Sequence, residues 1–215
     1  YPETTGVTWC KEACQDVEVE THEMKIIPLF PCTLHAYTVK DFDKDGLLDY
    51  IYAEYEFDRE GRTISNRGGW QSSVDYTAED NPLLDVVEKT LSHDFFFRTL
   101  KDENYRIDDL WININRPGAF NHKHNHPGSI FSGVLWINAP KDSGQLVLDN
   151  PNTFTMWDEM NSYSDEFQKI VPVHPAYYMT PKEGMIIIFP SSMYHKVDLN
   201  KSVENRVSVS FNIGR

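Results

Sequence analysis

The alternation of polar and apolar residues is clearest in the second half of the chain. In the segment 206–212, the even-numbered residues are polar and share one face of a strand. Other short β-rich segments, separated by Gly, Pro and Asn, lie at 109–115, 129–138, 145–149, 184–189 and 195–199. Many short strands with frequent turn residues predict a sandwich or barrel rather than a parallel α/β sheet.

The first half of the chain has one clear helical pattern. Between Leu83 and Leu100, apolar residues recur near the helical period. A first strand is predicted within 25–39, where two prolines interrupt a β-branched run, and a charged loop is predicted over 41–49. A helical insertion between strands is predicted over 157–170.

The length and composition indicate one domain with a terminal appendage. Residues 1–24 are acidic with little periodicity, so they are predicted to be an N-terminal extension, followed by a single domain over 25–215. Hydrophobic residues make up 40% of the 215-residue chain, which suffices for a core. No apolar run approaches the roughly 20 residues that span a bilayer, so a soluble protein is expected.

The charge balance narrows the range of partners. The chain carries 33 acidic and 20 basic residues, a formal net charge of −13. Binding to nucleic acid or to an anionic membrane surface depends on Lys and Arg, so neither partner is favoured.

The three cysteines favour, without deciding, a reducing compartment. Cys10 and Cys14 are four residues apart and can pair on one helical turn if the compartment is oxidising, while Cys32 is left over. Unpaired thiols in a cytoplasmic protein are the favoured reading. Because the chain begins at Tyr1 rather than Met, a secretory origin stays open.

A histidine cluster is the richest chemical feature of the chain. His122, His124 and His126 stand at i, i+2 and i+4. Residues two apart share one face of an extended chain, so neighbouring imidazoles can converge on one metal ion. The alternative is a solvated polar loop. One loop offers too few ligands for a metal, and the remote candidate is His195, which follows the apolar segment 185–190.

An arginine and a serine follow eleven and thirteen residues after His195. Arg206 and Ser208 alternate onto one face of a predicted strand. A guanidinium directed inward is costly unless it meets an anion, and it binds a carboxylate with two parallel hydrogen bonds. An ion pair with an acid of the chain is the competing interpretation.

The order of these motifs resembles that of the iron(II)- and 2-oxoglutarate-dependent oxygenases. The chain is more closely similar to a 2-oxoglutarate oxygenase subfamily found in phages and marine microbes, distantly related to prolyl hydroxylases. The resemblance covers about residues 26–213. The stretches that carry it are 65–72, 124–134, 189–195 and 206–212.

The resemblance implies a mainly β protein with supporting helices, folded as a double-stranded β-helix of the jelly-roll, cupin-like kind. It implies iron(II) bound by His124 and His195, and 2-oxoglutarate as a co-substrate that chelates the metal. Arg206 and Ser208 would hold the far carboxylate of the ketoacid. The implied reaction uses O2 to decarboxylate the ketoacid and hydroxylate an unknown substrate.

One position departs from the pattern of that superfamily. The usual ligand set is His-x-Asp/Glu followed by a distant His, and His126 stands where the carboxylate belongs. His126 itself can be the ligand, His122 and His124 can be the near pair, or water can be the third ligand. We favour His124, His126 and His195, with His122 beside them as a residue that supports the ligands.

Further polar residues on the predicted strands are candidates for the same site. Asn115, Ser132 and Trp136 are predicted to contact the ketoacid, while Asn113 and Asn212 are predicted to support the ligands through hydrogen bonds. Ordinary turn or core positions explain several of them equally well.

The segment 41–52 matches the beginning of a calcium-binding loop. Asp41, Asp43, Asp45 and Asp49 occupy positions 1, 3, 5 and 9, but Tyr52 stands where a bidentate Glu belongs. A solvated acidic turn is favoured over a calcium site.

Two other functions remain open from the sequence. One is a cupin-like protein that binds metal without oxygenase activity. The other is a three-histidine dioxygenase that uses no 2-oxoglutarate, in which Arg206 would hold a carboxylate of the substrate itself. Dependence on the ketoacid distinguishes them.

Overall fold

The computed structural model describes residues 32–39, 42–73, 76–77, 81–91, 95, 99–100, 104–151, 162–170 and 174–215. The N-terminal extension predicted over 1–24 lies outside the described residues, as do Cys10, Cys14, Asp41 and Trp157.

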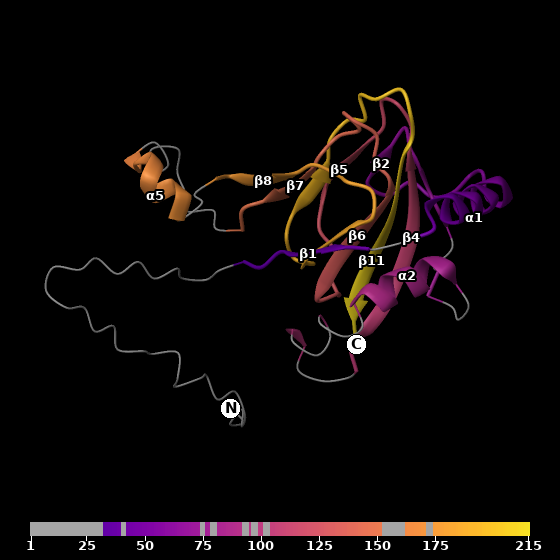
Figure 1. Ribbon diagram of the computed structural model, residues 1–215, viewed down its shortest axis with the longest axis horizontal. Helices are drawn as coiled ribbons and strands as arrows, with labels where there is room; N and C mark the ends of the chain where they lie inside the picture. Colours follow the sequence, from indigo (N-terminus) through magenta and orange to yellow (C-terminus); the bar gives the residue numbers. More distant parts are fainter. Residues whose placement is uncertain are drawn as a thin grey trace, which may run out of the picture. The chain divides into compact units, whose positions relative to one another are not determined.

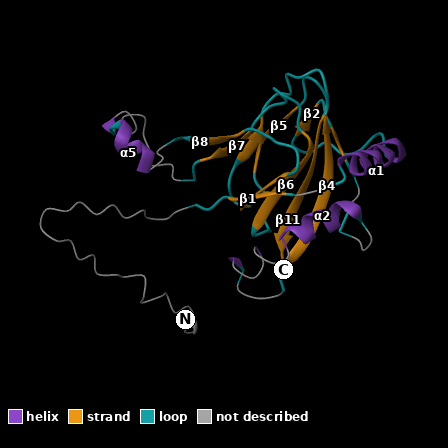
Figure 2. Ribbon diagram, viewed as in Figure 1, coloured by secondary structure: helices purple, strands orange, loops and turns teal. Residues whose placement is uncertain are grey.

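Two antiparallel sheets form the body of the described part (Figures 1 and 2). The larger has the order β1-β9-β6-β11-β4-β3 and the smaller the order β2-β5-β10-β7-β8. The larger sheet comprises β1 (His35–Thr38), β3 (Trp70–Gln71), β4 (Arg106–Asn115), β6 (Phe131–Asn138), β9 (Met185–Pro190) and β11 (Arg206–Gly214). The smaller comprises β2 (Asn66–Arg67), β5 (Phe120–His124), β7 (Leu146–Asp149), β8 (Ala176–Met179) and β10 (His195–Val197). The predicted double-stranded β-helix is confirmed.

The helices α1 and α2 cover the outer face of the larger sheet (Figure 1). The described helices are α1 (Lys44–Phe57), α2 (Pro82–Leu91) and α5 (Asp165–Ile170). Leu47 and Ile51 of α1, and Leu83, Val87 and Leu91 of α2, belong to one core cluster with apolar residues of β4, β6, β9 and β11. None of the helices in the described ranges is long and apolar enough to cross a membrane.

The strands β4 and β11 present opposite kinds of side chain on their two faces. Leu110 and Ile112 of β4 and Val207 and Val209 of β11 belong to the helix-side cluster. The polar residues between them, such as Asn113 and Ser208, line a cavity between the sheets instead. The helices therefore cover the apolar outer face of β4 and β11, and the polar face of these strands points into the barrel.

A second, smaller core lies between the two sheets. Trp136 of β6 and Phe189 of β9 pack there with Leu146 and Leu148 of β7. This cluster fills one part of the interior with side chains, so the cavity beside it has defined walls.

The prediction of a loop over 41–49 is wrong for residues 44–49, which form the first turns of α1. Asp43 caps the helix, because its Oδ1 accepts a hydrogen bond of 3.0 Å from the Gly46 amide. Asp45 and Asp49 then lie within the helix. The described part of this segment therefore lacks the loop that an EF-type calcium site requires. The Asp-rich pattern that was interpreted as a loop is an N-cap Asp followed by the first turns of a helix.

We predict that Asp43→Ala lowers the free energy of unfolding by about 1 kcal/mol, the usual value of a helix N-cap. Asp49→Asn, which neutralises an exposed residue inside the same helix, is the matched control and should change stability less. Chemical denaturation with and without calcium measures both. A calcium-dependent stabilisation that either variant removes would restore the calcium-loop interpretation.

The remaining predicted elements agree with the structure in part. Strands are confirmed in all six predicted segments of the second half of the chain, and α2 confirms the helix predicted from Leu83 as far as Leu91. The sequence analysis missed α1, the short strands β2 and β3, and the strands β5 and β8. Of the strand predicted within 25–39, the described residues show β1 at 35–38.

Candidate functional site

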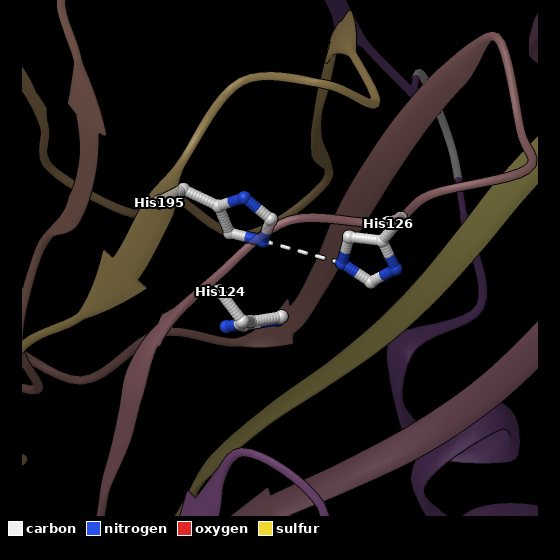
Figure 3. A group of neighbouring side chains, drawn as sticks. All are labelled: His124, His126 and His195. Atoms are coloured by element: carbon white, nitrogen blue, oxygen red, sulfur yellow. Dashed lines mark hydrogen bonds between the residues drawn. The ribbon is translucent and has the colours of Figure 1, made fainter.

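Three histidines from two segments of the chain converge at one end of the smaller sheet (Figure 3). His124 ends β5, His195 begins β10, and these two residues are paired in the antiparallel register. His126 lies two residues beyond β5, where its backbone amide donates to the Ser191 carbonyl at 2.9 Å. One ligand atom from each ring lies within 4.8 Å of the others. This is the one cluster of three potential metal ligands in the described ranges.

Backbone carbonyls orient two of the three rings. Nδ1 of His124 is 2.7 Å from the His122 carbonyl oxygen, and Nδ1 of His195 is 3.0 Å from that of Met193. A carbonyl can only accept, so both Nδ1 atoms carry the proton and donate it. Each Nε2 atom is then left with a lone pair, which is the state that ligates a metal.

The distance between the rings suits ligands of one ion. Nε2 of His126 and Nε2 of His195 are 3.3 Å apart, as Figure 3 marks. Two bonds of about 2.1 Å that meet at a metal ion at 90–109° place their nitrogens about 3.0–3.4 Å apart. The observed separation falls in that interval, so one ion can contact both rings.

Burial keeps the three imidazoles neutral. Desolvation, with smaller contributions from the nearby imidazoles, lowers the pKa of His195 to about 3, while the backbone hydrogen bond to Met193 opposes the shift. Desolvation, with a contribution from His124, lowers the pKa of His126 to about 4. Desolvation also lowers the pKa of His124. Neutral rings at ordinary pH are available to a metal without first losing a proton.

Aromatic side chains hold two of the rings. Trp111 of β4 stacks on His126 with ring centroids 5.5 Å apart, and Phe189 contacts His195 edge-on at 4.8 Å. These contacts restrict ring rotation, because a displaced ring loses a buried apolar neighbour.

His122 lies outside the three-histidine group. Its side chain is exposed, and its ring contacts Phe120 edge-on at 5.0 Å. What it contributes to the cluster is its backbone carbonyl, which orients His124. The geometry therefore favours the pair His124 and His126 over the pair His122 and His124.

A cavity of about 250 Å³ extends from the histidines between the two sheets. Its lining brings together six predicted residues: Arg206, Ser208, Asn113, Asn115, Ser132 and Trp136. They share one face of β4, β6 and β11, where the register pairs Ser208 with both Asn113 and Trp136. The histidines and the predicted ketoacid residues thus face the same space.

Arg206 is a buried cation that forms no salt bridge among the described residues. It is 1% exposed, and its Nη1 donates to the carbonyl oxygens of Ser143 and Asp198. Its Nη2 is buried with no hydrogen-bond partner. Burial lowers the pKa of Arg206 to about 10 while the charge of Asp198 opposes the shift, so the group is charged at neutral pH. The carboxylate of Asp198 pairs with Lys196 at 2.9 Å.

The donor set around Arg206 fits an incoming carboxylate. A buried guanidinium with one unused donor is costly, and a carboxylate that reaches it restores the hydrogen bond and balances the charge. Gly144 leaves room for this arrangement: its φ is +92°, and a Cβ there would lie 2.8 Å from Nη1 of Arg206. A side chain at position 144 would therefore collide with the guanidinium.

Asn115 belongs to a chain of amides on the cavity wall. Its Nδ2 donates to Oδ1 of Asn121 at 3.2 Å, and Nδ2 of Asn121 donates to Oγ of Ser65 at 3.1 Å. Asn113 donates to Oγ of Ser210 at 3.1 Å. Asn113 and Asn115 both line the cavity, so their amides border the space that a ligand would fill.

Ser132 and Asn212 tie strands together near His126. The Ser132 hydroxyl donates to Oδ1 of Asn212 at 2.8 Å and lies 2.9 Å from Oγ of Ser191. Nδ2 of Asn212 donates to Asp109 at 3.2 Å. Since the Ser191 carbonyl accepts the His126 amide, this network supports the segment that carries His126. Ser132 was predicted to contact the ketoacid. In the structure its hydroxyl lies between Asn212 and Ser191 and links their segments.

Several lining residues were missed by the sequence analysis. Trp111, Asn121, Gln71, Asp109 and Arg62 all face the cavity. Gln71 lies in the stretch 65–72 that carries the family resemblance, and Asn121 lies beside the histidine cluster, so both had a signal nearby. No sequence signal pointed to Arg62, because it reaches the cavity only through the folding of the segment before β2 against the barrel.

Comparison with known proteins places these residues in a known framework. Residues 109–212 match a family model described as "Putative 2OG-Fe(II) oxygenase". The matched segment contains the three histidines as well as Arg206 and Ser208. Comparison with curated protein sequences finds no match.

Solved structures share the fold at low sequence identity. A prolyl-4-hydroxylase from Pseudomonas putida aligns with a TM-score of 0.55 at 16% identity, over 86% of this chain and 93% of that one. A Trichoplax adhaerens prolyl hydroxylase, solved with a peptide of hypoxia inducible factor, aligns with a TM-score of 0.56 at 12% identity, over 84% and 83%. HygX from Streptomyces hygroscopicus, solved with nickel and 2-oxoglutarate, aligns with a TM-score of 0.55 at 8% identity, over 85% and 83%.

These findings agree with the motifs in the sequence. The family match covers the cavity face and all three histidines, and the shared fold extends beyond it to most of the chain. The segment 109–212 therefore matches the 2OG-Fe(II) oxygenase family model, and the chain shares its fold with solved prolyl hydroxylases, which is consistent with a distant relationship to that superfamily.

Proposed function

We propose that this protein is a non-haem iron(II)- and 2-oxoglutarate-dependent dioxygenase that hydroxylates a substrate. The observation that carries the proposal is the pairing, in one cavity, of a three-imidazole cluster with a buried guanidinium that has an unused donor and no salt bridge among the described residues. A metal chelated by a ketoacid needs both features, one for the metal and one for the far carboxylate.

In this proposal each residue has one task. His124, His126 and His195 hold the iron through their Nε2 atoms, and the carbonyls of His122 and Met193 keep two of the rings in the required tautomer. Arg206 and Ser208 bind the distal carboxylate of the ketoacid, with Asn115 and Trp136 beside it on the cavity wall. When bound, iron(II) and 2-oxoglutarate supply the reaction in which O2 converts a C–H bond to C–OH, releasing succinate and carbon dioxide.

The chain also governs access of water. Trp136, Phe189 and Leu146 line the cavity with apolar surface beside the histidines. Exclusion of water there strengthens the interactions of Arg206 with an anion and protects the reacting groups.

A histidine in place of the usual carboxylate ligand is also compatible with a second function, a dioxygenase that uses no ketoacid. Three neutral ligands leave one more positive charge on the metal complex than two histidines and a carboxylate do. That set also suits a dioxygenase without a ketoacid, in which Arg206 holds a carboxylate of the substrate itself. A cupin-like protein that binds metal without oxidation is the remaining alternative.

Ketoacid dependence tests the proposal. We expect 2-oxoglutarate to bind anaerobic protein loaded with iron(II) and to change its visible absorption, and we expect succinate to form slowly in air. Binding is the safer readout, because turnover without the true substrate is slow. Iron binding without any effect of 2-oxoglutarate would favour the two alternatives.

A further inference from the structure

Three buried side-chain polar atoms lack a hydrogen-bond partner in the described part of the chain. One is Nε2 of His35, whose ring lies against Phe95 and Phe131. The other two are guanidinium nitrogens, Nη2 of Arg206 and Nε of Arg62, and both arginines line the same cavity. The distal carboxylate of a ketoacid accounts for Arg206. Arg62 is left with an unused buried donor.

The backbone holds Arg62 in place from both sides. Its amide donates to the Gln71 carbonyl at 2.8 Å, and its carbonyl accepts from Nδ2 of Asn66 at 3.2 Å. The preceding residue, Gly61, has a φ of +57°, and a Cβ there would lie 2.4 Å from the Gln71 carbonyl oxygen. The turn before Arg62 therefore requires glycine, and the arginine begins from a fixed point.

A network of hydrogen bonds braces the rest of this loop. The carboxylate of Asp58 accepts from the Gly61 amide at 3.1 Å and from Ser73, while its carbonyl accepts from the Trp70 indole at 2.7 Å. The loop 58–73 is thus closed on itself at its base. A pre-positioned cation loses little conformational entropy when it binds.

The same loop is joined to the strand that carries His124. The His122 amide donates to the Ser65 carbonyl at 2.8 Å, and the Ser65 hydroxyl accepts from Asn121 at 3.1 Å. Asn66 of β2 pairs with Asn121 of β5. Arg62 is consequently held in a defined position relative to the candidate metal ligands.

The charge inside the cavity runs opposite to that of the whole chain. Its lining contains the cations Arg62 and Arg206 and one carboxylate, Asp109, whereas the chain as a whole carries −13. Asp109 accepts a hydrogen bond from Asn212 on the opposite strand. A guanidinium turned toward a partly desolvated space in an acidic protein suits an anionic ligand.

We propose that Arg62 binds an oxyanion of the primary substrate, a carboxylate or a phosphate, while Arg206 binds the ketoacid. The substrate class is thus a small acid or an acidic group of a larger molecule. This inference rests on the proposed function, because a second anion site is needed only when the ketoacid occupies Arg206.

The test uses protein loaded with zinc, which is redox-inert, and saturated with 2-oxoglutarate so that Arg206 is occupied. The probes are N-acetylglycine, inorganic phosphate and the neutral N-acetylglycinamide. Ligand-observed NMR gives their dissociation constants, since it detects millimolar binding. The variants are Arg62→Gln, Arg62→Lys and the matched control Arg59→Gln, an exposed arginine of the same loop that pairs with Glu56.

We expect at least one of the two acids to bind the loaded wild type and the neutral amide to bind far more weakly. Arg62→Gln should weaken the acid at least about tenfold, Arg62→Lys should weaken it less, and Arg59→Gln should not change it. If only phosphate or only N-acetylglycine binds, that result identifies the oxyanion that the site prefers. The 2-oxoglutarate dissociation constant should be the same in all variants.

Three results would overturn the inference. The first is that neither acid binds the wild type. The second is that Arg62→Gln binds the acid with the affinity of the wild type. The third is that Arg62→Gln weakens the binding of 2-oxoglutarate itself, which would assign Arg62 to the ketoacid. Failure of the proposed function is separate: 2-oxoglutarate then does not bind the metal-loaded protein, while Arg62-dependent binding of the acids is still measurable.

Discussion

His195→Ala is expected to abolish metal binding. His195 is 5% exposed, and its Nε2 is directed at the cluster by the Nδ1–H bond to Met193. It is the one candidate ligand of the three that does not come from the segment 124–126, so its loss leaves two neighbouring rings. Mutation of a residue that only orients a metal ligand lowers metal affinity about 10–100-fold. Loss of His195 is expected to lower it by more than that. Equilibrium dialysis followed by metal analysis measures this.

His122→Ala is the matched control for that experiment. It removes an imidazole from the same histidine-rich segment, but from an exposed position outside the cluster. Metal affinity should stay within a few-fold of the wild type, because the His122 backbone carbonyl still orients His124. Equal loss in both variants would instead assign His122 as a ligand. Thermal unfolding of the metal-free proteins shows whether His195→Ala retains its fold.

Arg206→Gln is expected to remove binding of 2-oxoglutarate and to spare the metal. Hydrogen bonds to charged groups contribute about 1.5–3 kcal/mol, so the dissociation constant should rise about ten- to hundredfold or more. At a concentration of 100 times its dissociation constant, 2-oxoglutarate should stabilise the wild type by about 2.7 kcal/mol and the variant far less. Calorimetric titration and thermal unfolding of zinc-loaded protein measure the two effects.

The control for Arg206→Gln is Arg106→Gln, which removes the same charge from an exposed position at the start of β4. It should bind 2-oxoglutarate as the wild type does. If Arg206→Gln lost the metal as well, Arg206 would be acting on the fold of the site rather than on the ketoacid. If it retained full ketoacid affinity, the second carboxylate would have to be bound elsewhere.

Six of the strand positions in the second half of the chain could be predicted from the sequence, because these predictions rest on local alternation. The helix α1 could not, because its first turn is an Asp-rich, Gly-containing segment with the composition of a loop. Its identity depends on burial of Leu47 and Ile51 against a distant sheet. Strands of two residues, such as β2 and β3, leave too short a pattern to detect.

The candidate ligands were also predicted from the sequence, and the favoured set, His124, His126 and His195, is the one that the structure brings together. Spacing alone did not select that set. Spacing made His122, His124 and His126 equivalent, since all three share one face of an extended chain. The chain leaves β5 after His124, and the bond from the His126 amide to Ser191 then turns that residue toward His195. His122, inside the strand, stays at the surface.

By itself the sequence determined the two-residue periodicity of β11, the presence of an Arg and a Ser on its polar face, and the missing carboxylate ligand at His126. Only the tertiary structure decided that this polar face points inward. In an isolated strand, either face can be buried. Here α1 and α2 cover the apolar face, so Arg206 is enclosed in the barrel without a salt bridge among the described residues. The same enclosure returned Arg62, distant in sequence, to the cavity of the histidines.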